Sequence, residues 1–231
     1  MAPRAAPIAE DVIDVLKREG AIVADPADVP SMIDPDSQKN FGRWSICSGT
    51  GASKGNDANC SVVLKYGMKR DFNRWLATLG PTAPVKSLTE LREWNLKHER
   101  AGAIKYGQSN LDISDEMDVE ADRVRYEADR AKDIELAAIQ GIDEVMKANR
   151  LDALVFPGSS GAALAARPGY PSITVPFALV PNAGPFPEGF DPKPGPFGIS
   201  FTGMACSEPR LIELGYAFEQ ATKRRVAPPV P

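Results

Sequence analysis

Hydrophobic residues recur at helical spacing near both ends of the chain. Near the start they are Ile8, Val12, Ile13 and Leu16. Gly20 stands where such a helix would stop, so the spacing predicts a helix over residues 8–19, and the apolar run AIV after it predicts a strand. Near the end the same spacing is found at Leu211, Leu214, Gly215 and Phe218. Ser207 precedes them and predicts a capped final helix.

Two more helices are predicted between residues 61 and 100. The run SVVLKY (61–66) is either a strand or the apolar lead into the helix MKRDFNRWLATLG, which ends at Gly80 with a proline beyond it. The tetrapeptide SLTE then forms a capping box, in which Ser87 accepts from the backbone N–H of Glu90 and the Glu90 side chain reaches back. The next helix is therefore expected to begin at Leu88.

A charged segment over about 115–149 keeps a narrow apolar face formed by Ile134, Ala138, Ile142 and Val145. A single narrow apolar face on an otherwise charged segment predicts a long surface helix, and the charged side chains are expected to be solvated.

Three short apolar runs follow: LDALVF, SITVPF and FGISFTG. Each predicts a strand, and in the last of them Phe197, Ile199 and Phe201 alternate to one side. The stretch 180–196 between the second and third runs is rich in proline, which cannot donate to a β-ladder, so it predicts a loop that joins neighbouring strands. Helices and strands alternate, which predicts the α/β class with a mostly parallel or mixed sheet.

The organisation expected from the length is a single domain over residues 1–231, since 231 residues can bury one large core. A long irregular excursion at about 31–60 interrupts the pattern. It is rich in Gly, Ser, Asn and Asp without period, and GTGASKGND (49–57) is expected to be its most mobile part.

Composition narrows the classes of partner. The formal net charge of −4 and a charged fraction of 25% give no basic surface for nucleic acid or anionic membranes. No apolar run is long enough to span a bilayer, and the first residues do not form a signal peptide. We therefore expect no nucleic-acid partner and no membrane; the compartment stays open, with the cytoplasm slightly favoured.

Cysteine and histidine offer little material for metal or triad chemistry. The three cysteines, Cys47, Cys60 and Cys206, lack metal-ligand spacing. Free thiols are the favoured interpretation, and a Cys47–Cys60 bridge within one loop is the alternative. The single histidine, His98, lies on a polar helix and is interpreted as a surface residue. No metal site and no cofactor are predicted.

The stretch PGSSGAA (157–163) resembles the nucleophile loop of a hydrolase, which makes Ser159 and Ser160 candidates for a reacting group. A serine hydroxyl needs a base, and without a usable histidine the remaining solution is a lysine kept neutral by burial. Lys65 has apolar neighbours on one side and Lys54 lies in the glycine-rich loop, but neither is a convincing base. The favoured interpretation is a turn that leaves a strand and opens a short helix.

Six segments together resemble the C-terminal half of the amidase signature family. They are GAIVADPADVP, KRDFNRWLATLG, SLTELREWN, KYGQ, LDALVFPGSSGAALAARPGYPSITVP and PFGISFTGMACSEPRLIELGYAFEQATKRR. Their order and spacing match across nearly the whole chain apart from the excursion. The resemblance implies part of an amidase-type mixed β-sheet flanked by helices.

The resemblance also implies where the chemistry lies. Family members hydrolyse carboxamides with a serine nucleophile, a second serine in a cis peptide and a neutral lysine, all in an N-terminal half that this sequence does not contain. Catalytic residues are therefore expected to be absent from this chain. PGSSGAA matches a turn after the LDALVFP strand, so the resemblance assigns Gly158, Ser159 and Ser160 to the substrate mouth, with Gln108 of KYGQ as a weaker candidate.

The resulting expectation is the C-terminal region of an amidase-family hydrolase that acts on carboxamide C–N bonds, inactive alone, whose partner in the full-length enzyme is a small-molecule amide. The start MAPRAAP favours a piece of a longer enzyme over a naturally short relative. The alternative is a non-catalytic binding or scaffold protein that keeps the amidase fold. A third, less favoured hypothesis is a serine hydrolase that uses Ser159 or Ser160 with Lys54 or Lys65. Exposed apolar surface is expected to favour self-association, with a homodimer at high concentration.

Overall fold

The computed structural model describes residues 6–182, 184–186, 188–190 and 192–227. Contacts within the chain divide it into two compact units. Unit 1 runs up to Ile33 and resumes at Glu135, and unit 2 is Asp34–Ile134. The single domain expected from the length stays a prediction.

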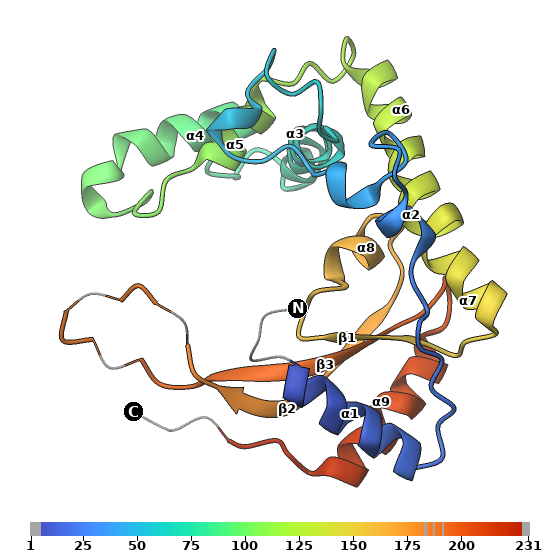
Figure 1. Cartoon of the computed structure of the whole chain (residues 1–231). Helices are drawn as coiled ribbons and strands as arrows, with labels where there is room; N and C mark the ends of the chain where they lie inside the picture. Colours follow the sequence, from blue (N-terminus) through green and yellow to red (C-terminus); the bar gives the residue numbers. More distant parts are fainter. Residues whose placement is uncertain (1–5, 183, 187, 191, 228–231) are drawn as a thin grey trace. The chain divides into compact units, whose positions relative to one another are not determined.

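A three-stranded sheet forms the centre of unit 1 (Figure 1). Its strands are β1 (Leu154–Pro157), β2 (Ser172–Val180) and β3 (Gly195–Thr202), in the order β1-β3-β2. The three predicted strands are thus confirmed, and the proline-rich loop does join two neighbours, β2 and β3.

The strand directions differ from those predicted. Both described pairings, β1 with β3 and β2 with β3, are antiparallel, where alternating helices and strands predicted a parallel or mixed sheet. The short helix α8 (Ala162–Ala166) does connect two strands of the same direction, β1 and β2. The chain then returns as β3 and lies between them, so each neighbouring pair is antiparallel. The α/β class with flanking helices is confirmed.

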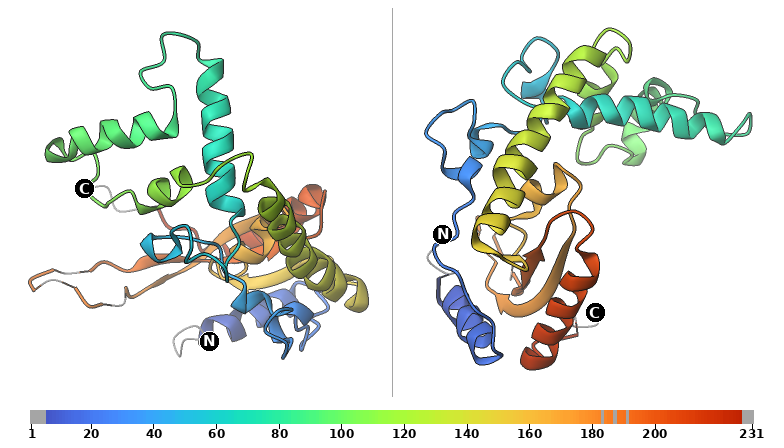
Figure 2. Two further views of the ribbon diagram at one scale, coloured as in Figure 1. Left: turned by 90° about the horizontal axis from the view of Figure 1, so that it is seen from above. Right: turned by 90° about the vertical axis from the view of Figure 1, so that its right-hand side faces the viewer.

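The two faces of the sheet differ in chemistry because side chains alternate along each strand. One face packs against α1 (Ala6–Arg18) and α9 (Glu208–Thr222), which lie together on it (Figures 1 and 2). Its buried core comprises Val12, Val15, Val175, Phe177, Ile199, Phe201, Leu211 and Phe218. The predicted inward alternation of β3 is therefore confirmed. The other face carries hydroxyl side chains, described below with the site.

Local sequence rules held at one of the two marked helix ends of unit 1 and failed at the other. Gly20 takes φ +90 just after α1, as a C-terminal glycine should. The AIV run after it is not a strand, and Ile22 is 98% exposed, so this expectation was wrong. Ser207 occupies the N-cap position of α9, but its hydroxyl donates to the Met204 carbonyl instead of capping the helix.

The predicted long helix over about 115–149 is three helical segments. They are α6 (Arg123–Ile134), the π-helical η4 (Glu135–Ile142) and α7 (Asp143–Asn149). Gly141 leaves helical geometry, and a Cβ at this position would approach the Leu136 carbonyl oxygen to 2.7 Å, so the close main-chain contact favours glycine. In unit 1 the remaining helix is the short α2 (Pro30–Ile33).

Unit 2 is built from helices and short 3-10 turns. The helices besides α6 are α3 (Val63–Thr78), α4 (Leu88–Lys97) and α5 (Ser109–Asp115), and the 3-10 turns are η1 (Phe41–Arg43), η2 (Thr50–Ala52) and η3 (Glu99–Ala101). SVVLKY is therefore the lead into a helix, the second of the two options. Ser87 caps α4 through the Glu90 N–H at 3.1 Å as predicted, but the Glu90 carboxylate accepts from the Lys86 N–H.

Most of the irregular excursion is exposed or half-buried, but a few of its residues are buried in unit 2, which its composition did not indicate. Ala52 is 6% exposed and Asp57 is 4% exposed. Cys47 and Cys60 form a disulfide, so the favoured expectation of free thiols was wrong for these two and the alternative holds. Cys206 is a free, exposed thiol.

Candidate functional site

The candidate site begins where β1 ends, in the turn Gly158–Gly161. Gly158 has φ +59, a conformation that glycine adopts readily. Its N–H donates to the Gly198 carbonyl at 2.8 Å. Its own carbonyl accepts from the hydroxyl of Ser200 at 2.6 Å. Both main-chain polar groups of Gly158 are therefore hydrogen-bonded to residues of β3.

A hydroxyl chain supports that carbonyl from the sheet face opposite α1 and α9. Thr174 Oγ1 lies 2.7 Å from Ser200 Oγ, and Ser172 pairs with Thr202 in the same way at 2.7 Å. A serine hydroxyl has one proton. Because Ser200 gives its proton to Gly158, Thr174 must be the donor to Ser200. Ser200 was not among the predicted site residues, although its polar side chain alternates with the apolar residues Ile199 and Phe201 along β3.

The two serines of the turn serve its backbone geometry. Both are exposed. The Ser160 hydroxyl donates to the Pro157 carbonyl at 2.9 Å, and the Ser159 carbonyl accepts the N–H of Ala162 at 3.0 Å as α8 begins. A hydroxyl that donates to a main-chain carbonyl is not activated by a base. This arrangement matches the favoured interpretation of a turn that opens a short helix.

The two lysines considered as bases both lie in unit 2 and are paired with carboxylates. Lys65 is 1% exposed, and its Nζ lies 2.5 Å from Asp57 Oδ2. Lys54 Nζ lies 3.1 Å from Asp122 Oδ2. Both lysines are thus held in ion pairs within unit 2.

Two neighbouring cations lower the pKa of the buried carboxyl group of Asp57. Burial alone would raise its pKa, but hydrogen bonds and positive charge from Lys65 and Arg125 lower the pKa to about 2. The Asp57 carboxylate is therefore held between the two cations Lys65 and Arg125.

His98 is exposed as predicted; its Nδ1 lies 2.7 Å from the Trp94 carbonyl and its ring stacks on that indole.

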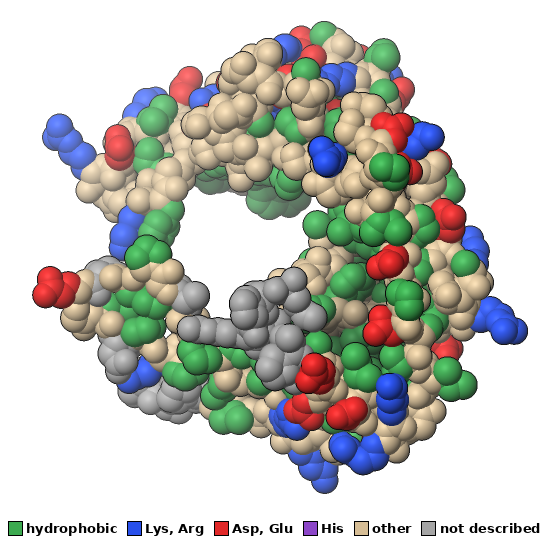
Figure 3. Space-filling model, in the orientation of Figure 1, with side chains coloured by type: hydrophobic (Ala, Val, Ile, Leu, Met, Phe, Trp, Pro, Cys, Tyr) green, Lys and Arg blue, Asp and Glu red, His purple; other side chains and the backbone are tan. Residues whose placement is uncertain are grey.

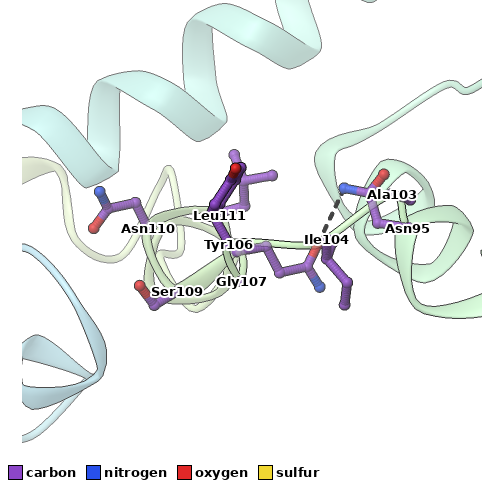
Figure 4. A pocket seen from close by; sticks show the side chains of 9 residues that line it. Asn95, Ala103, Ile104, Tyr106, Gly107, Ser109, Asn110 and Leu111 are labelled. Carbon is purple, nitrogen blue, oxygen red and sulfur yellow. Dashed lines mark hydrogen bonds between the residues drawn. The ribbon is translucent and has the colours of Figure 1, made fainter. Parts of the chain in front are cut away.

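Gln108, the remaining predicted site residue, borders a cleft of about 360 Å³ in unit 2 (Figure 4). It is the residue before α5, and its Oε1 accepts from Asn95 Nδ2 at 3.1 Å. The other lining residues are Ala103, Ile104, Tyr106, Gly107, Ser109, Asn110 and Leu111. This cleft belongs to unit 2, whereas Gly158, Ser159 and Ser160 belong to unit 1. Asn95 is a neighbour of Gln108 that no sequence pattern marked.

Neither a metal-ligand cluster nor a helix that could span a membrane occurs in the described part of the chain. Among these residues, no group of three His, Cys, Asp or Glu side chains is placed to hold a metal ion. None of the described helices combines the length and the apolar character needed to cross a bilayer.

An antiparallel sheet with helices on both sides, and a small-residue turn at a strand end, defines an α/β protein with a candidate ligand turn. No family model matches the sequence. A probable amidase of Arabidopsis thaliana is 30% identical over 217 residues, which cover 94% of this chain and 36% of that protein. A putative amidase of Arthroderma benhamiae is 38% identical over 98 residues, or 41% of this chain and 17% of the relative.

Solved structures give the same result. The peptide amidase of Stenotrophomonas maltophilia matches with a TM-score of 0.72 and 31% identity, over 96% of this chain and 40% of that one. An amidase family protein of Bacillus anthracis matches with a TM-score of 0.68 and 25% identity, over 98% and 37%. Nearly the whole chain is thus similar to part of known amidases, which supports its resemblance to the C-terminal region of the amidase signature family. The chain spans about a third of the length of the Arabidopsis relative.

Proposed function

We propose that this chain forms the C-terminal region of an amidase-type hydrolase that cleaves carboxamide C–N bonds, and that it is inactive alone. The observation that carries the proposal is the match itself: 94% of the chain aligns with 36% of an amidase. On this view the chain supplies scaffold and one wall of the substrate cleft.

The contacts of the candidate nucleophiles support the inactivity of the isolated chain. The Ser160 hydroxyl donates to the Pro157 carbonyl, and the considered bases Lys54 and Lys65 are ion-paired. A serine without a base keeps only the binding and oxyanion contributions to rate.

The turn Gly158–Ser160 is proposed as the part of the wall nearest the substrate. Loops at strand ends are common ligand sites in α/β sheets, and small residues let a ligand approach the backbone. Gln108, with a side-chain amide at the edge of its own cleft, is the second proposed contact.

The test measures ammonia release from peptide amides by the isolated chain, because the solved relatives include peptide amidases. We expect a rate equal to that of buffer, and no labelling by a fluorophosphonate probe. Ser159→Ala and Ser160→Ala are the matched variants. Release above buffer that disappears in either variant would overturn the proposal and support an independent serine hydrolase.

A further inference from the structure

The disulfide of unit 2 closes an irregular segment that contains three glycines. Cys47 and Cys60 are 13 positions apart, and their Cα atoms lie 5.0 Å apart. Both are buried, with exposed fractions of 1% and 9%. Beside them the main chain pairs between Ile46 and Ser61. We call residues 47–60 the closed loop.

The closed loop supplies both hydrogen-bond acceptors that the structure gives to Lys65. Lys65 is the third residue of α3, and its ammonium donates to the Ala52 carbonyl at 3.0 Å and to Asp57 Oδ2 at 2.5 Å. Its side chain is 1% exposed, so water does not replace them. A buried charge without partners is costly. The position of the closed loop therefore decides whether the buried ammonium of Lys65 keeps its hydrogen-bond acceptors.

Asp57 also links a second helix to the loop. Arg125 of α6 donates to its Oδ1 at 2.9 Å and to its main-chain carbonyl. The one carboxylate thus lies between cations from α3 and α6. If the loop moved away, two positive side chains would be left facing each other without their shared counter-ion.

Three further polar contacts join the closed loop to residues 110–122 at the surface. The Gly49 N–H donates to Asn110 Oδ1, the Lys54 N–H donates to Glu116 Oε2, and Lys54 Nζ pairs with Asp122; all are exposed. Exposed polar contacts of this kind contribute little to stability. The disulfide and the buried Asp57 are therefore the main constraints on the loop.

We propose that the Cys47–Cys60 disulfide is a redox-sensitive clamp, which holds Asp57 and Ala52 on the buried ammonium of Lys65. A dithiol reductant would open it by thiol–disulfide exchange. One reductant thiolate attacks a protein sulfur to form a mixed disulfide, and the second closes the oxidised reductant ring and releases both protein thiols. Two electrons pass from the dithiol to the protein, and the clamp becomes a free, glycine-rich segment.

Reduction must then loosen the elements that Asp57 joins. Release of the closed loop restores its conformational freedom and removes the anion from Lys65 and Arg125. The start of α3 is expected to open first, because Lys65 lies there. Unit 1 contains neither the disulfide nor the ion pair, so its own core is expected to keep its protection.

The test is amide hydrogen exchange on the Cys206→Ser protein, in which Cys47 and Cys60 are the only cysteines that a reductant can act on. Oxidised and dithiothreitol-reduced samples are compared. We expect exchange over residues 47–69 to rise at least tenfold on reduction, while amides of β3 and α9 change less than twofold. Unchanged exchange over 47–69 after complete reduction would overturn the proposal, and this comparison needs no substitution near the clamp.

A second comparison separates the ion pair from simple cross-linking. Lys65→Met keeps the length of the side chain and removes its charge. In this variant the rise in α3 exchange on reduction should be at most one third of the rise in the parent. Lys69→Met, one turn along and half-buried beside Asp115, is the matched control and should respond as the parent does. An equal response of all three proteins would show that the disulfide acts only as a cross-link.

Discussion

The hydroxyl of Ser200 donates a hydrogen bond of 2.6 Å to the carbonyl oxygen of Gly158. Ser200 is 5% exposed, and it also accepts from Thr174. A side chain in the middle of β3 thus fixes the peptide plane at which β1 turns. The turn that sequence reasoning assigned to the substrate mouth is held by a residue 42 positions away in the sequence.

Replacing Ser200 with Ala should destabilise unit 1. The substitution removes two hydrogen bonds and leaves the Gly158 carbonyl without its side-chain partner, so we expect a loss of about 1–3 kcal/mol in the free energy of unfolding. Urea denaturation followed by circular dichroism measures it. Ser160→Ala, at an exposed hydroxyl of the same turn, is the control and should stay within about 0.5 kcal/mol of the parent. Equal effects of the two variants would contradict the assigned role of Ser200.

Gly161→Ala should be far more destabilising than Gly158→Ala. A Cβ at position 161 would lie 2.4 Å from a carbon of the Phe156 ring, near the root of that side chain, so ring and backbone must both shift. We expect a loss above about 2 kcal/mol. At position 158 the nearest ring atom, of Phe197, is 3.5 Å away, and the main cost is the positive φ, about 1–2 kcal/mol.

The same urea unfolding assay compares these two glycine variants. A smaller loss for Gly161→Ala than for Gly158→Ala would show that Phe156 can move aside at little cost. The packing of the turn against β1 would then be looser than its contacts indicate.

The stability of unit 2 should fall between about pH 4 and pH 2. The pKa of Asp57 is about 2 in the folded protein against an ordinary value of 3.8. A carboxyl group whose pKa is lower when folded stabilises the protein above the unfolded pKa, and this contribution is lost as pH falls through the folded pKa. The contribution is about 2 kcal/mol. Unfolding free energies measured at pH 5, 4, 3 and 2 test it.

Asp57→Asn provides the control for that pH dependence. It should destabilise the protein at neutral pH, because Lys65 and Arg125 lose their anion, and the difference from the parent should shrink by about 2 kcal/mol between pH 4 and pH 2. Parallel pH profiles for parent and variant would show that other carboxyl groups account for the acid sensitivity.

Periodic elements of this fold were predictable, and long-range contacts were not. Helix α4 begins at Leu88 because Ser87 caps it, which is a rule local to four residues. The antiparallel placement of β3 depends on where a long proline-rich loop returns the chain, and no local pattern encodes that. Lys65 was noted for its apolar neighbours, but its partner Asp57 lies in a glycine-rich stretch whose composition is typical of a mobile loop. Burial there follows from the disulfide and the ion pair.

Exposed apolar residues on unit 1 should promote self-association. Figure 3 shows hydrophobic side chains reaching the surface among charged ones. On α9, Ile212 and Tyr216 are 58% and 63% exposed, and both border a cleft of about 230 Å³ beside β2. Apolar surface of this kind favours a second copy as partner. We expect a monomer–dimer equilibrium in sedimentation velocity, with more dimer at high concentration.

Ile212→Lys with Tyr216→Lys should shift that equilibrium to monomer, since two charges would enter the contact. Ile22→Lys is the control: Ile22 is 98% exposed but stands alone after α1, so its change should leave the equilibrium as it is. A parent protein that stays monomeric at high concentration would contradict the expectation.

In the context of a full-length amidase, Ser159→Trp should raise KM for bulky amides. Ser159 is exposed in the turn that ends β1, where an indole would fill space that small residues leave open to a ligand. Because the side chain is proposed to border the substrate and not to react, kcat for a small amide should stay close to that of the parent. Steady-state kinetics with a small and a bulky amide separates the two effects. Ile22→Trp, remote from the turn in the sequence and fully exposed, controls for the added indole. Unchanged kinetics with both substrates would leave the turn as scaffold and remove Gly158, Ser159 and Ser160 from the proposed site.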